Sequence, residues 1–440
     1  MKKPIFIFSS ILFILMNICY ATVFAQQDQN EELKFNIQLR PRAEFRNGLF
    51  TPILEGQKPA FFVAQRSRIG LKYSKNQKLK IGLSTQVVTT WGNDQQVQFS
   101  GNNITLYEAW AQFYFNSKWN IKLGRQVFSY DDERILGDLD WNNAARKHDA
   151  VLLGFEKNKF TANLALAYNQ NAENVTNTFY NSQLSQPYKS MEFLWAKYKL
   201  TDALAISFLG INIGMQNRID SSVSHLQTIG GNIFYKKQKL NLIGTYYYQM
   251  GDNPIENAPS IKTDAWMAAL KVDYNIDKRF GIGIGSDYLS GRNMNSTSAN
   301  VTYFNPLYGT HHKFYGFMDY FYVSSPHRNV GLWDSYLNLK VNSTEKLSWQ
   351  VALHHFEAAA KVIDYSGNMV GSTLGNEADL TFGYNLMKDV KLTGGYSQMF
   401  TASSMKYVKN ILPPQNMKPV QNWIWLSINI TPEIIVSKSK

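Results

Sequence analysis

The sequence predicts an all-β fold, namely a transmembrane antiparallel up-and-down β-barrel of about 18 strands. Three observations lead to this prediction. Polar and apolar residues alternate in many short segments, and beyond the N-terminus no stretch approaches the ~18 uninterrupted apolar residues of a spanning helix. Aromatic residues make up 14% of the chain, yet its mean hydropathy is only −0.30. The N-terminus has the pattern of an export signal. A barrel whose side chains alternate between lipid and lumen accounts for all three.

Residues 1–25 are predicted to be a secretory signal peptide. Lys2 and Lys3 precede a mostly apolar run, and Ala25 closes a small-residue cleavage pattern. A retained membrane anchor is the alternative. Polar residues such as Asn17 interrupt the apolar span that an anchor needs, so we favour the cleaved peptide.

Composition narrows the function classes of the remaining chain. The only cysteine, Cys19, lies in the signal peptide, so the mature chain has neither disulfides nor a zinc–thiolate site. The formal net charge of the full chain is +12. A basic exported protein is not expected to read nucleic acid, and its surplus charge suits anionic lipid headgroups or an anionic solute. We expect residues 26–440 to form a single outer-membrane barrel domain.

Arginines mark one face of the first two predicted strands. In the segments 35–46 and 61–73, apolar side chains occupy alternate positions, and arginines lie at the positions between them. Side chains two residues apart share a face of a strand, so each strand has one apolar face and one basic face. The arginines concerned are Arg40, Arg42, Arg46, Arg66 and Arg68.

The same alternation returns along the whole chain. Each segment is close to the ~9–11 residues that a tilted strand needs to cross hydrocarbon, and a total of about sixteen also fits the pattern. The predicted strands are 35–46, 61–73, 78–90, 104–115, 119–128, 148–157, 159–170, 190–200, 203–215, 226–237, 239–250, 263–275, 279–290, 330–341, 347–357, 376–386, 390–400 and 421–430.

Connections between these strands fall into two classes. Short turns such as 157–159 and 201–202 alternate with long loops such as 129–147 and 291–329. Transmembrane barrels carry short turns on one rim and long loops on the other. A secreted β-sandwich or β-helix shares the composition, but a sandwich has no reason to segregate loop lengths in this way. The pattern favours the barrel.

The loop after the fifth predicted strand carries a long motif. GRQ at 124–126 precedes Tyr130, then come DER at 132–134, a glycine, a tryptophan, an asparagine and an arginine, and then DAV at 149–151. This motif resembles that of the alginate export family of outer-membrane porins. The resemblance extends to the arginine-bearing strands and to the stretch YFNPLYGTHHKFYGFMDYF at 303–321. It implies an 18-stranded barrel in the Gram-negative outer membrane, whose arginine-lined lumen passes anionic polysaccharide.

An arginine track suits such a solute. Guanidinium groups stay charged and bind carboxylates through two parallel hydrogen bonds, so several of them hold a polyuronate weakly at many points. For Arg46 and Arg66, which lie near strand ends, contact with lipid headgroups is the alternative. Alternation points Arg125 toward lipid unless a bulge resets the register. The candidate lumen residues are Arg40, Arg42, Arg46, Arg66, Arg68, Arg125, Arg134 and Arg146.

Carboxylates of the same motif are the second group of candidates. Asp132, Glu133 and Asp149 are candidates for a role in loop structure or selectivity. Pairing with Arg134 and Arg146 would fold the loop into the pore, because an unpaired charge in a confined space is costly. A glycosidase-like carboxylate pair is the alternative, although no calcium-loop spacing and no other catalytic motif accompanies it.

The sequence therefore predicts a porin for anionic, uronate-like oligo- or polysaccharides, of which alginate is one example. The alternative function is an outer-membrane enzyme that acts on polysaccharide or lipid through carboxylates of 129–149. We expect no catalytic residue, metal site or cofactor. The expected partners are outer-membrane lipid, the anionic saccharide and periplasmic export proteins.

The barrel prediction has a direct test. A closed hydrogen-bonded barrel resists dodecyl sulfate until it is boiled, because each backbone group is satisfied inside the sheet. Unheated protein should therefore migrate differently from boiled protein on a denaturing gel. Identical migration of well-folded, detergent-extracted protein would contradict the prediction.

Overall fold

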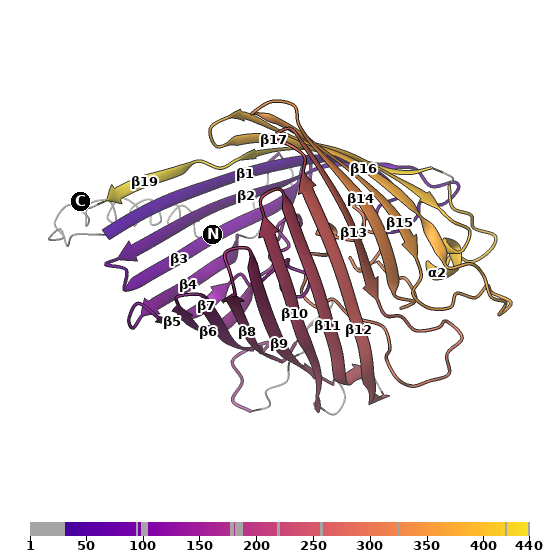
Figure 1. Cartoon of the computed structure of the whole chain (residues 1–440), viewed down its shortest axis with the longest axis horizontal. Coiled ribbons are helices and arrows are strands. Elements are labelled where there is room, and N and C mark those ends of the chain that lie inside the picture. Colours follow the sequence, from indigo (N-terminus) through magenta and orange to yellow (C-terminus); the bar gives the residue numbers. More distant parts are fainter. Residues whose placement is uncertain are drawn as a thin grey trace, which may run out of the picture.

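The fold is a closed antiparallel β-barrel (Figure 1), seen in a computed structural model of the chain. The predicted signal peptide, 1–25, lies outside the described residues. The structure describes residues 31–93, 96–97, 104–176, 180, 188–217, 221–255, 258–323, 325–418 and 420–438.

Nineteen strands form one sheet among the described residues, and two short helices lie in its loops. The strands are β1 (Glu31–Asn47), β2 (Ala60–Lys75), β3 (Leu79–Thr90), β4 (Thr105–Tyr114), β5 (Trp119–Gln126), β6 (His148–Lys157), β7 (Phe160–Tyr168), β8 (Ser190–Lys199), β9 (Leu204–Gln216), β10 (Val223–Lys237), β11 (Leu240–Ile255), β12 (Ala258–Asn275), β13 (Phe280–Leu289), β14 (Leu332–Asn342), β15 (Leu347–Glu357), β16 (Thr373–Met387), β17 (Val390–Thr401), β18 (Gln421–Ile430) and β19 (Glu433–Lys438). The helices are η1 (His311–Lys313) and α2 (Met405–Val408). No helix in this part of the chain is long and apolar enough to cross a membrane.

Eighteen strands close the barrel, as the alternation predicts. β18 pairs with both β17 and β1, so the ring is complete at β1. β19, which the sequence reading missed, pairs with the beginning of β1 and extends the sheet beside it (Figure 1). Pro432 interrupts the alternation because it cannot donate a ladder bond. Its carbonyl nevertheless accepts a hydrogen bond from the Ile37 N–H at 3.1 Å, and the strand resumes after it.

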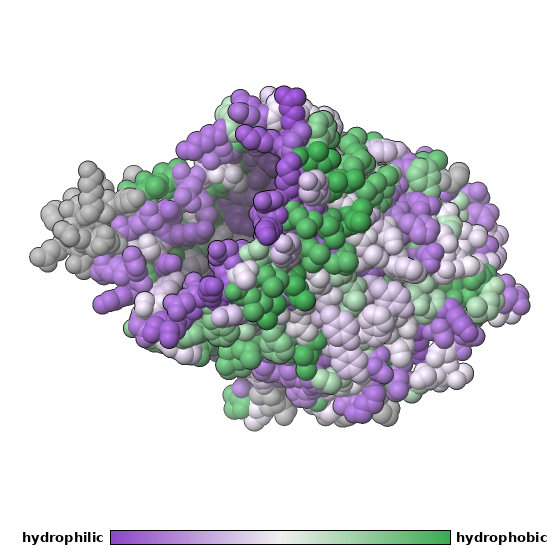
Figure 2. All heavy atoms as spheres, in the orientation of Figure 1, coloured by the Kyte–Doolittle hydropathy of each residue, from purple (hydrophilic) through white to green (hydrophobic). Residues whose placement is uncertain are grey.

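The two faces of the wall differ as the period-two pattern requires. On β1, Arg40 and Arg42 are buried toward the lumen, whereas Ile37 is 43% exposed on the outside. Exposed apolar side chains recur around the barrel, including Leu270 and Ile284. Figure 2 shows apolar side chains gathered on the outer wall, with hydrophilic ones concentrated toward its ends. Such a wall matches a membrane environment.

Loop lengths separate between the two rims. The longest connections, such as 127–147 and 290–331, follow odd-numbered strands and therefore share one rim. Turns such as 158–159 and 388–389 follow even-numbered strands and lie on the other rim. This segregation confirms the prediction. It also places both long loops where they can enter the lumen from the same side.

Because β18 closes the ring, β19 is predicted to be dispensable for barrel formation. A chain ending at residue 432 keeps the β18–β1 ladder and should still form a heat-modifiable barrel, with a lower melting temperature because the β19–β1 ladder is lost. A chain ending at residue 420 loses β18 and should not close. Circular dichroism melts and gel mobility of both refolded truncations check this. Failure of the longer chain to form a barrel would contradict the assignment of closure to β18.

Candidate transport site in the barrel lumen

Loop 129–147 crosses the barrel interior. At its beginning, the Trp195 Nε1 on β8 donates to Asp131 at 3.0 Å, and the Thr245 hydroxyl on β11 donates to Asp132 at 3.3 Å. Further on, Asp140 reaches β1 and β2. The path requires tight turns: four non-glycine residues adopt positive φ, which is tolerated only where surrounding contacts enforce it. They are Asp131, Glu133, Leu139 and Ala145.

Arg134 fixes this loop to the far wall. Its guanidinium donates two hydrogen bonds to Asp287 on β13, at 2.7 and 3.0 Å, and a third to Asp132 at 2.8 Å. The Phe314 ring lies 4.0 Å from the guanidinium carbon. Burial on its own lowers the pKa of Arg134, but the Asp287 and Asp132 carboxylates outweigh it and raise that pKa well above the ordinary value. Arg134 is thus a buried, charged anchor of the loop.

A second loop segment joins the first. Leu136 and Tyr308 form an isolated parallel bridge, and the Thr310 N–H donates to the Glu133 carbonyl at 2.8 Å. Arg146 donates to the carbonyls of Tyr308 and Gly309. A side chain at Gly309 would meet the Arg134 carbonyl, since an added Cβ would lie 2.1 Å from that oxygen. We call the two segments, 129–147 and 303–323, the plug.

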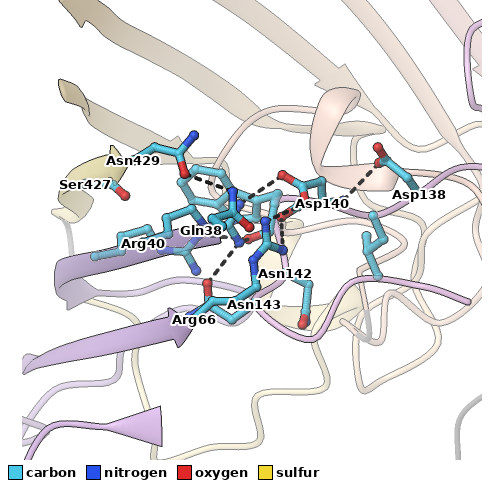
Figure 3. A network of polar contacts seen from close by, with 12 residues as sticks. Gln38, Arg40, Arg66, Asp138, Asp140, Asn142, Asn143, Ser427 and Asn429 are labelled. Carbon is cyan, nitrogen blue, oxygen red and sulfur yellow. Dashed lines mark hydrogen bonds and ion pairs between the residues drawn. The ribbon is translucent and has the colours of Figure 1, made fainter. Parts of the chain in front are cut away.

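Asp140 lies between two arginines of the opposite wall (Figure 3). Its Oδ2 accepts from Arg40 Nη1 at 2.9 Å, and its Oδ1 accepts from Arg66 Nη2 at 2.7 Å. Arg40 also donates to Asn143 at 3.0 Å. Burial raises the pKa of Asp140, but Arg66 and Arg40 more than offset this, and the net pKa is lowered. The loop therefore presents an ionised carboxylate to the arginine face.

The other arginines of β1 and β2 line the same face. Arg42 and Arg46 both bond to the Glu44 carboxylate, each at 2.8 Å. Arg68 donates to Gln86 on β3 at 2.7 Å and lies 3.5 Å from the centre of the Tyr107 ring. These side chains share the lumen face because they are spaced by two residues along adjacent, paired strands.

Trp141 packs beside Asp140 against β1 and β18. The Arg42 guanidinium lies over one part of its ring system, 4.0 Å from the centroid, and His312 stacks on it at 4.3 Å and 14°. Its edges meet Trp423 and Trp425 of β18 at 5.5 and 4.8 Å. Aromatic and cation–π contacts of this kind hold a ring firmly in place.

Two cavities lie on either side of this stack. One of about 960 Å³ opens toward the long loops and is lined by basic residues that include Arg42 and Arg46. The other, of about 460 Å³, lies toward the short turns and is lined by Asp140 and by the lysines Lys313, Lys340 and Lys391. Trp141 and His312 border both cavities. The stack therefore separates two basic chambers.

Arg125 and Asp149 are placed differently from the other predicted residues. They face each other on β5 and β6 and form a bidentate pair at 2.9 and 2.7 Å on the outward face near the rim, where their side chains are 34% and 51% exposed. The expected place of Arg125 in the lumen is corrected, because plain alternation continues from the outward Leu123. Both residues border the rim of the larger cavity, but neither points into the pore.

The remaining predicted carboxylates are engaged within the plug. Asp132 pairs with Arg134, and Glu133 accepts from Lys313 at 3.2 Å. The structure also brings in residues outside the predicted site. Glu44 shares the arginine face, and a group of buried acidic residues and a histidine lies on β13–β16. That group is Asp287, Asp334, His354, Glu377 and Asp379. Period-two alternation places all five inward and is the signal that could have found them.

Comparisons with known proteins agree with this architecture. A family model described as alginate export matches residues 31–404. The chain belongs to the alginate export family. No curated protein matches it.

Three solved structures illustrate the shared fold. Acinetobacter baumannii OccAB4 has a TM-score of 0.59 at 10% identity, over 93% of this chain and all of that one. Pseudomonas aeruginosa OpdQ has a TM-score of 0.56 at 14% identity, over 91% of this chain and 98% of that one. Pseudomonas aeruginosa OccK9 (OpdG) has a TM-score of 0.61 at 10% identity, over 91% of this chain and 98% of that one. The family match and the closed barrel together identify an outer-membrane channel.

The Arg134–Asp287 ion pair leads to a prediction about the stability of the plug. Arg134→Met leaves Asp287 buried without its partner, which costs about 3–5 kcal/mol. Hydrogen exchange of 129–147 should therefore accelerate by about a hundredfold or more. Arg125→Met removes an exposed pair worth about 0–1 kcal/mol and should leave this segment protected. Equal protection in the two variants would show that Arg134 does not hold the loop.

Proposed function

We propose that this channel passes anionic, uronate-like oligo- or polysaccharides and that the arginines of β1 and β2 bind their carboxylates. The observation that carries the proposal is the carboxylate of Asp140 held between two guanidinium groups of the lumen wall. A lumen face that binds the Asp140 carboxylate in this geometry can also bind the carboxylates of a solute. The track comprises Arg40, Arg42, Arg46, Arg66 and Arg68.

Charge balance supports the choice of an anion. Five guanidinium groups line this face, and the carboxylates paired with them among the described residues are those of Glu44 and Asp140. The surplus is positive, and the chambers on both sides of Trp141 add further basic side chains. A confined basic surface raises the local concentration of anions and speeds their entry.

Weak, repeated binding suits transport. Each sugar of a polyuronate carries one carboxylate, and each arginine offers a bidentate site. A solute that holds several such sites can move from one to the next without a deep energy minimum. The channel does this without chemistry, and the family name supports a saccharide as cargo.

A smaller carboxylate is the second candidate. The lumen is divided at Trp141, so an extended polysaccharide must displace the stack, whereas each chamber accepts a small molecule. One solved structure with this fold, that of Pseudomonas aeruginosa OpdK, was determined with vanillate, a small carboxylate. The enzyme alternative has less support, because Asp132 and Glu133 are committed to ion pairs within the plug.

Selectivity in planar bilayers tests the proposal. Wild-type channels in a salt gradient should be anion-selective, and an oligouronate should block them. Arg46→Gln with Arg68→Gln should shift selectivity toward cations and weaken the block about tenfold or more, because each lost charge-assisted bond is worth about 1.5–3 kcal/mol. These two arginines do not hold Asp140, so the plug stays in place.

The matched control is Arg125→Gln, which removes one positive charge from the outward face. It should leave selectivity and block unchanged. Cation selectivity of the wild-type channel, or equal behaviour of the double variant and the wild type, would refute the arginine track. Block by simple monocarboxylates with none by oligouronates would favour the smaller cargo.

A further inference from the structure

We infer that Asp140 occupies the binding site of the solute, and that a uronate carboxylate replaces it between Arg40 and Arg66. The inference rests on the proposed function and names the residue that competes with the cargo. It also assigns a role to the Asp140–Trp141 tip of the loop: the tip withdraws when the solute takes its place.

The geometry separates a fixed part of the site from a replaceable part. Arg66 is fully buried in the wall, and Arg40 is nearly so. The Asp140 side chain, in contrast, is 47% exposed and borders the 460 Å³ cavity. A molecule in that cavity therefore meets the carboxylate of Asp140 directly, while the guanidinium groups stay where the strands hold them. The carboxylate is the exchangeable partner.

Asp140 does not use the full binding capacity of the site. The buried Nε–H groups of Arg40 and Arg66 have no acceptor among the described residues. A guanidinium carries five N–H donors, and a buried donor without an acceptor is destabilising. A uronic acid offers ring and hydroxyl oxygens next to its carboxylate. Such a ligand can satisfy donors that an aspartate, with only its carboxylate, leaves unused.

Backbone hydrogen bonds close the tip of the loop into a compact turn. The Arg146 N–H donates to the Asp138 carbonyl at 2.8 Å and closes the base of the tip. Within it, the Ala145 N–H donates to the Asn142 carbonyl at 3.0 Å. Positive φ at Leu139 and at Ala145 flanks the part that contacts the arginines. Backbone strain at such positions is relieved when the contacts that enforce it are exchanged.

Displacement of Asp140 also moves Trp141, the next residue along the chain. Trp141 and His312 separate the two cavities, so withdrawal of the tip joins them. The anchors at Arg134 and at Gly309 lie outside the tip and need not move. A solute that binds the open arrangement better than the closed one shifts the population toward it. Carboxylate binding and opening are thus coupled through two adjacent residues.

Asp140→Asn tests the inference by calorimetric titration of sodium D-glucuronate into detergent-solubilised protein at constant ionic strength. Asparagine keeps the size and one acceptor of the side chain but loses the charge that competes for the site. Because a tethered competitor lowers apparent affinity, the variant should bind glucuronate about tenfold or more tightly than the wild type. Adding Arg66→Gln to Asp140→Asn should remove this gain.

Asp149→Asn is the matched control, since it removes one carboxylate from the outward rim and should leave affinity unchanged. Heat-dependent gel mobility shows that each variant is folded. Tighter binding by Asp140→Asn, with or without measurable binding by the wild type, supports the inference. Wild-type binding with equal or weaker binding by Asp140→Asn overturns it and leaves the proposed channel function standing. Absence of binding in both overturns the inference, and absence of anion selectivity as well overturns the proposed function with it.

Discussion

Ion pairing across a closed ring of strands is the interaction on which the interior depends. The barrel wall satisfies its own backbone, but it leaves a space that side chains alone do not fill. The two plug segments occupy that space, and arginine–carboxylate pairs hold them at both ends. Arg134 bonds to Asp287 on one wall, and Asp140 bonds to Arg40 and Arg66 on the other. Without these pairs, buried charges on both walls would lack partners.

The two ends of the loop differ in a way that suits a channel. The Arg134 pair is buried on both sides, and removal of either partner leaves an uncompensated charge. The Asp140 carboxylate faces a cavity, so an incoming anion can substitute for it without exposing the arginines to an apolar environment. One end therefore anchors the loop, while the other is open to exchange. A polar interior held by ion pairs responds to a charged solute in a way that an apolar core would not.

Much of this architecture follows from alternation alone. Eighteen strands, the loop-bearing rim and the inward direction of Arg40 and Arg42 were all predicted, because a period of two fixes which side chains share a face. β19 was missed because Pro432 breaks that period. The acidic group on β13–β16 was also missed, although the same alternation places its members inward.

The site itself was predicted only in part. The sequence identifies the arginines of β1 and β2 but not what they touch, because Asp140 is about a hundred residues away in the chain. The side chains of a loop that folds into the lumen do not alternate as those of a strand do. Its contacts depend instead on how the ring of strands closes in three dimensions. For the same reason, the sequence predicted that carboxylates of this loop pair with Arg134, as Asp132 does, but not that Asp140 reaches Arg40 and Arg66.

An experimental structure of the channel with a bound triuronate tests the central claim most directly. If the solute displaces Asp140, a sugar carboxylate lies between Arg40 and Arg66, with Asp140 moved out of hydrogen-bonding distance and Trp141 withdrawn from His312. A triuronate bound elsewhere in the lumen, with the Asp140 pairs intact, would contradict it.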